Sequence, residues 1–204
     1  MPDTKDDIQQ RFTYNLGRVA ALIALYGKLS AGRGRPAVAE TDLLRAAVVL
    51  LHASLEDVLR SIAELLLPTR PAEVFAKWEL ALPSSPDKKT AKLSLMDLLE
   101  FRGRDIDEVL SFAIQQHLER SNYNSFHEVA RAVVELGLDP AGIREHQPDL
   151  DSMMKRRHRI AHRADRNATI GRGQYSAAHL AHKTVETWLQ AVRSTGDKIL
   201  EQAR

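Results

Sequence analysis

The sequence contains no cysteine among its 204 residues. A chain without thiols forms no disulfide framework, no thiolate metal site and no cysteine nucleophile. Long apolar runs are missing too, because the longest, such as residues 46–51, fall far short of the roughly 20 residues that span a bilayer. The polar N-terminus lacks the apolar core of a secretory signal. We therefore expect a cytoplasmic protein that makes no contact with a membrane.

Aromatic residues and glycine-rich phosphate loops are also scarce. Aromatic residues make up 5% of the chain, whereas alanine and leucine dominate its apolar residues, and this mix favours helix over strand. The Gly-Arg-Gly sequence at 32–34 lacks the further glycine, the lysine and the flanking strand of a phosphate loop, so we expect no cofactor. The composition predicts an all-α fold, and the length predicts a single domain over residues 1–204.

Apolar residues recur three and four apart along most of the chain, as they do on the buried face of a helix. Those of the first helix are Ile8, Phe12, Leu16, Val19, Ile23 and Tyr26, and those of the long helix are Leu44, Val48, Leu51, Leu55, Val58, Ile62 and Leu65. Thr41 is placed to cap a long helix, and Ser125 with Glu128 forms a capping-box signature further along. We predict an up-and-down helical bundle with extra short helices before the penultimate helix. Its expected parts are a first helix at 5–30, a long helix at 40–67, a variable helical insert at 71–147, a penultimate helix at 148–164 and a C-terminal helix at 174–203.

The positive charge of the chain is concentrated in one short stretch. The net charge is only +2, but the twelve residues 155–166, KRRHRIAHRADR, hold six basic residues and one acid. This stretch therefore carries +5 and the rest of the chain −3. A solvated helix face usually mixes signs, whereas guanidinium groups match the oxygens of a phosphate. The basic residues are Lys155, Arg156, Arg157, Arg159, Arg163 and Arg166.

Two histidines lie within this basic stretch. His158 and His162 are four residues apart and therefore share one face of a helix, about 40° from one another. Arg157 projects about 140° from His162 by backbone position on the same helix, but its long side chain can still swing toward the imidazole. The spacing of the histidines also fits a zinc pair, but a zinc hydrolase has glutamate where this chain has Arg159, and the local cations disfavour a dication. We therefore expect no metal, and an ordinary solvated face remains the alternative.

The segment from Arg157 to His162 resembles the signature of HEPN domains, in which an arginine, a polar residue and three further residues precede a histidine. The stretch 51–60, LHASLEDVLR, resembles part of the long second helix of stand-alone HEPN proteins. The order of parts is similar as well, with a long helix, a variable insert, the motif helix and a closing helix. The chain is thus similar to the RiboL-PSP and MAE-type groups of the HEPN family.

This resemblance implies a metal-independent endoribonuclease that acts as a homodimer. His162 would transfer protons, Arg157 would stabilise charge on the phosphate, and His158 would orient the substrate or share the proton transfer. Family toxins that are silenced by modification of a tyrosine carry this tyrosine two residues after the motif histidine. This chain has Ala164 at that position, so we do not expect it to be silenced in this way. A role as a toxin or as a defence or stress effector, with an antitoxin or inhibitor protein as partner, is the expected setting. The remaining basic residues, Lys155, Arg156, Arg159, Arg163 and Arg166, would bind the RNA.

His52, Glu56 and Arg60 are spaced four apart on the long helix and are predicted to form a polar stripe beside the apolar one. Two carboxylates here are candidates for a supporting role. Glu56 or Asp57 could hold Arg157 in position, although Glu56 and Arg60 also have the spacing of an ordinary surface ion pair. A second reading of the whole chain also stays open, in which a non-catalytic HEPN-like domain binds RNA or a protein partner. Cleavage of RNA in the presence of EDTA would separate the enzyme from the binding module.

Overall fold

The computed structural model describes residues 3–31, 38–71, 74, 101–167 and 177–203. Within these ranges the chain is helical and contains no strand, which confirms the predicted all-α fold. The elements are α1 (Lys5–Leu29), α2 (Val38–Leu66), the 3₁₀ turn η1 (Leu67–Thr69), α5 (Ile106–Arg120), α6 (Phe126–Glu135), the 3₁₀ turn η3 (Pro140–His146), α7 (Gln147–Arg163) and α8 (His182–Gln202).

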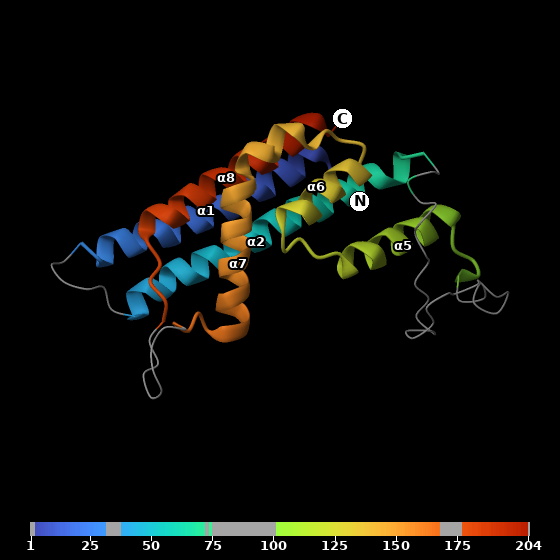
Figure 1. The fold of residues 1–204 in the computed structure, drawn as a ribbon. Coiled ribbons are helices and arrows are strands. Elements are labelled where there is room, and N and C mark those ends of the chain that lie inside the picture. Colours follow the sequence, from blue (N-terminus) through green and yellow to red (C-terminus); the bar gives the residue numbers. More distant parts are fainter. Residues whose placement is uncertain (1–2, 32–37, 72–73, 75–100, 168–176, 204) are drawn as a thin grey trace.

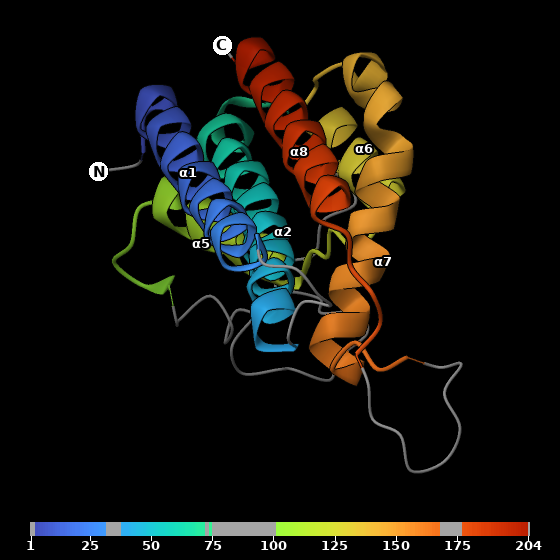
Figure 2. The same cartoon turned by 90° about the vertical axis from the view of Figure 1, so that its left-hand side faces the viewer.

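Three long helices form the body of the bundle. Helices α1, α2 and α8 lie side by side along a common direction, and both views show this arrangement (Figures 1 and 2). Helix α7 packs on α2 and α8 and crosses them steeply (Figure 1). The shorter α5 and α6 lie on the side of α2 away from α1 (Figure 1). The predicted packing of the long, penultimate and C-terminal helices against one another is confirmed.

The predicted apolar stripes form the core. Every apolar residue predicted for the first helix is buried, and so are nearly all of those predicted for the long helix. Helices α1 and α8 approach closely where Gly196 faces the ring of Phe12. A side chain at position 196 would collide with that ring, so the glycine permits the contact. The buried residues of α1 are Ile8, Phe12, Leu16, Val19, Ile23 and Tyr26.

The ends of several helices differ from the predictions. Helix α2 begins at Val38, so the prediction that Thr41 caps it is wrong, and the Thr41 hydroxyl instead accepts a hydrogen bond from Arg45. The C-terminal helix begins at His182, eight residues later than predicted. Ser125 caps α6 as predicted, since its hydroxyl accepts from the backbone N–H of Glu128, whereas the Glu128 carboxylate accepts from the backbone N–H of Asn124 and not from that of Ser125. The predicted helix at 71–82 and loop at 82–92 fall outside the described residues, apart from positions 71 and 74.

Candidate functional site

Helix α7 carries the whole predicted motif. It follows directly on η3 and has Pro148 in its first turn, where the missing N–H of proline has no helical partner to lose. Its first half is anchored in the core through Leu150, Met153 and Met154, all buried. From His158 onward most side chains are exposed, apart from the half-buried Ile160. The motif therefore lies where the helix leaves the bundle.

Arg157 is half-buried and lies about one helical turn after the buried Met153 and Met154 of α7. Among the described residues it has neither a hydrogen bond nor an ion pair. It lies close enough to α2 to affect His52: burial is the main cause that lowers the pKa of His52, and the Arg157 cation lowers it further. An arginine without a bound carboxylate keeps its whole fork of donors available for a ligand.

His158 and His162 are both exposed and lie against each other. Their ring centroids are 4.6 Å apart and their planes are tilted by 47°. The prediction that they share one face of the helix is thus confirmed. Arg157 projects about 140° from His162 around the helix and is half-buried, whereas both imidazoles face outward. One chain therefore presents the arginine and the histidines in different directions.

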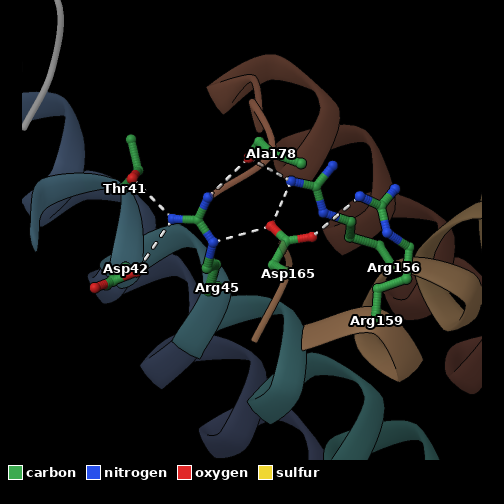
Figure 3. A network of polar contacts seen from close by, with 7 residues as sticks. All are labelled: Thr41, Asp42, Arg45, Arg156, Arg159, Asp165 and Ala178. Atoms are coloured by element: carbon green, nitrogen blue, oxygen red, sulfur yellow. Dashed lines mark hydrogen bonds and ion pairs between the residues drawn. The ribbon is translucent and has the colours of Figure 1, made fainter. Parts of the chain in front are cut away.

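A buried carboxylate anchors the chain just after α7 (Figure 3). Asp165 is completely buried, and its Oδ2 accepts hydrogen bonds from Arg45 Nε at 2.9 Å and Arg156 Nη2 at 2.6 Å. Both arginines also donate to the carbonyl of Ala178, at 2.8 and 2.9 Å. Two cations around one carboxylate compensate for its burial. The network joins α2, the end of α7 and the segment before α8.

The backbone at this point adopts an uncommon conformation. Ala164 and Asp165 have φ angles of 45° and 52°, in the left-handed region that residues with a Cβ rarely occupy. The turn closes with a hydrogen bond from the N–H of Asp165 to the carbonyl of Arg159, a helix-ending pattern that usually employs glycine. Two such residues cost on the order of 1–3 kcal/mol each. The buried network of Asp165 offsets this cost.

The basic stretch thus divides into two groups. Arg156, whose side chain is only 13% exposed, is committed to Asp165, and Arg159 lies near the same carboxylate at 3.7 Å. The other four basic residues have no acidic partner among the described residues. Arg156 is therefore a structural residue in this arrangement rather than part of an exposed RNA-binding surface. The four cations without an acidic partner are Lys155, Arg157, Arg163 and Arg166.

The predicted polar stripe on α2 is partly buried. His52 is fully buried and its Nε2 donates to the carbonyl of Tyr123 at 3.0 Å, which leaves Nδ1 without a hydrogen bond and 3.7 Å from Glu56 Oε2. Arg60 donates to the carbonyl of Ser121 and lies over the Tyr123 ring. Glu56 consequently faces His52 and does not form the surface pair with Arg60 that its spacing allowed.

Asp57, the other predicted supporting carboxylate, faces a different helix. Its Oδ2 accepts a hydrogen bond from Arg11 Nε of α1 at 3.1 Å, and the same guanidinium donates to Ser61. This contact ties α1 to α2. We therefore do not include Asp57 among the residues that support Arg157.

Three polar residues of the site were not singled out as a group from the sequence. Arg45 lies in the sequence within an apolar helical stripe. Asp165 was considered only as the single acid of the basic stretch, and His52 was considered only as one member of a polar stripe. An arginine inside an apolar stripe was the one available signal, because a buried guanidinium requires an anion. Its partner lies 120 residues away, a distance at which sequence spacing carries no information.

Among the residues that the structure describes, no group of three or more histidine, aspartate or glutamate side chains could hold a metal ion. His182 stacks on Tyr26 with ring centroids 5.6 Å apart.

Within the described part of the chain, no helix combines the length and apolar character that a bilayer crossing requires.

The helical bundle, with a half-buried arginine and an exposed histidine five residues later on its penultimate helix, is the arrangement expected of an HEPN-type domain. The model of the RiboL-PSP-HEPN family matches residues 17–183, and the chain belongs to this family. HEPN domains are commonly ribonucleases, so membership supports a nuclease or other RNA-related role. Comparison with curated proteins and with solved structures gives no match.

Proposed function

We propose that the protein is a metal-independent endoribonuclease whose site contains Arg157 and His162. The observation that carries this proposal is that the motif lies on an exposed helix end where four cations lack acidic partners in the described structure. Such a surface attracts a phosphodiester backbone. An imidazole titrates near neutral pH, and a guanidinium binds two phosphoryl oxygens at once. Together they supply what cleavage of RNA without a metal requires.

The proposed reaction is an internal transfer at phosphorus. One imidazole takes the proton of a ribose 2′-hydroxyl, and the oxygen attacks the neighbouring phosphorus to form a P–O2′ bond. The P–O5′ bond breaks, and a second imidazole donates a proton to the leaving 5′-oxygen. Arg157 stabilises the charge on the non-bridging oxygens. The products are a 2′,3′-cyclic phosphate and a 5′-hydroxyl.

We propose that the working site forms between two copies of the chain. The resemblance to HEPN proteins implies a homodimer, and one chain supplies only one motif arginine, Arg157, and one motif histidine, His162. Two α7 helices related by a twofold axis would bring together two arginines and two histidines, and thereby provide both an acid and a base. The same proposal includes His158 as a residue that orients the substrate or shares the proton transfer; Glu56, which faces His52 and has no hydrogen bond or ion pair with Arg157 in the described structure, is left out of it.

The biological setting is part of the proposal. In line with its resemblance to stand-alone HEPN proteins, we propose that the chain acts in the cytoplasm as a toxin or as a defence or stress effector. An antitoxin or inhibitor protein would then restrain it. Co-expression with the product of the adjacent reading frame tests this idea: relief of growth inhibition supports it, and no growth inhibition by the chain alone contradicts it.

The test of the enzyme uses a mixed RNA substrate with EDTA present. We expect cleavage that survives chelation, with 2′,3′-cyclic phosphate ends, and a loss of roughly 10²–10⁴-fold in rate for His162→Ala. The matched control is His127→Ala, which removes an exposed histidine on α6 and should leave the rate unchanged. Binding of RNA without cleavage by the wild-type chain would contradict the enzyme and favour a binding module.

A further inference from the structure

A basic hollow lies between α7 and the start of α8, beside the motif. Its volume is about 380 Å³. One wall comes from α7, and the opposite wall comes from the residues that lead into α8 and from its first turns. Among the described residues, no acidic side chain lines it. The lining residues that matter here are Lys155, Arg156, Arg159, His179, Leu180 and Trp188.

The polar groups of this hollow favour an anion. Lys155 and His179 are exposed, and neither has a hydrogen-bond or ion-pair partner among the described residues. Arg159 has only the 3.7 Å approach to Asp165, which is too long for a hydrogen bond. Donors that converge without an acceptor are the counterpart of phosphate oxygens.

The hollow also has an apolar part to its lining. Trp188 and Leu180 line it and are largely buried, so a ligand that enters meets apolar side chains as well as cations. A ribose phosphate has the same division between an apolar sugar or base and a charged group. The composition of the hollow therefore fits a segment of a nucleic acid strand better than a bare inorganic ion.

The hollow borders the histidine face of α7. Lys155 and His158 are three residues apart, as are Arg159 and His162, and residues at this spacing are neighbours on a helix surface. Their Cβ atoms lie roughly 5–6 Å apart. A strand whose scissile phosphate sits at the histidines would therefore place a flanking phosphate at the hollow.

We propose that this hollow is a subsite that binds a phosphate flanking the scissile bond of the RNA, with Lys155, Arg159 and His179 as its ligands. The inference rests on the proposed ribonuclease function. The hollow would add to the motif a second contact region that includes residues leading into α8, and the enzyme would need a substrate of more than two nucleotides for full activity.

The test compares a dinucleotide, which has only the scissile phosphate, with an octanucleotide of the same sequence type. The variant combines Lys155→Ala and His179→Ala. We expect the ratio of kcat/KM for the octanucleotide to that for the dinucleotide to fall by about tenfold or more in this variant. Only the octanucleotide has flanking phosphates, so only its cleavage depends on the contacts that the two substitutions remove. The matched control, Lys28→Ala, removes one exposed lysine from α1 and should leave this ratio unchanged.

The outcomes separate the subsite from the enzyme itself. A general structural defect would lower kcat/KM for both substrates equally, and an unchanged ratio in the double variant would overturn the subsite while the ribonuclease stands. If the wild-type chain cleaves neither substrate, the proposed function fails first.

Discussion

Arg45 of α2 and Asp165 after α7 are 120 residues apart in the chain and form a buried hydrogen-bonded ion pair of 2.9 Å. The pair fastens the end of the motif helix to the body of the bundle at the point where most other side chains of α7 are exposed. Arg156 and the backbone N–H of Ala178 also bond to Asp165, but they join it to α7 itself and to the segment before α8, whereas Arg45 joins it to α2. The position of His162, three residues before Asp165, therefore depends on this contact.

Replacement of the buried carboxylate tests this dependence. Asp165→Asn leaves the buried Arg45 and Arg156 without their counter-charge, and removal of one partner from a buried pair typically costs about 3–5 kcal/mol. We expect a marked drop in the midpoint of thermal unfolding measured by circular dichroism. Asp42→Asn is the matched control, because Asp42 contacts the same arginine but is 59% exposed, and its loss should cost less than about 1 kcal/mol.

Substitution by alanine is expected to have opposite effects on stability at two glycines. A Cβ at Gly196 would lie 2.3 Å from Cζ of the buried Phe12, so Gly196→Ala should destabilise the protein by roughly 1–3 kcal/mol through overpacking. A Cβ at Gly17 meets nothing within 4 Å, and Gly17→Ala should stabilise α1 by roughly 0.4–1 kcal/mol. Denaturant unfolding measures both. Equal effects of the two substitutions would contradict the close packing of α1 on α8.

The buried His52 predicts a dependence of stability on pH. Burial lowers the pKa of His52 in the folded protein, so the unfolded chain binds more protons once the pH falls below about 6.5. The free energy of unfolding should therefore decrease as the pH is lowered from 7 to 5. His52→Gln keeps an N–H for the Tyr123 carbonyl and removes the titrating group. Its stability should fall less steeply over this range, and an equally steep fall would contradict the assignment.

The planar shape of the Arg157 guanidinium predicts that a positive charge alone at this position is insufficient for RNA cleavage. Arg157→Lys keeps a cation but replaces the planar fork by a single ammonium, which does not bind two phosphoryl oxygens side by side. We expect kcat for RNA cleavage to fall by at least tenfold, with an unchanged unfolding midpoint, because Arg157 has no partner among the described residues. A variant with wild-type kcat would exclude Arg157 from the reaction.

Local patterns predicted the helices well, because the signals that start and end them lie within a few residues. Ser125 and Glu128 marked the start of α6, and Gly137, with φ of 71°, marked its end. Thr41 misled because a hydroxyl near a helix start resembles a cap whether or not the helix begins there. The pairing of Arg45 with Asp165 was not predictable, since it depends on how α7 crosses α2 and not on any local spacing.

The Arg45–Asp165 pair also has a consequence for how this family varies. Loss of either residue alone leaves a buried charge, whereas replacement of both by apolar residues of similar size can be nearly neutral. Relatives should therefore keep the two positions together or change them together. In an alignment of the family, the residues at these two positions would then identify the members that attach the end of the motif helix in the manner seen here.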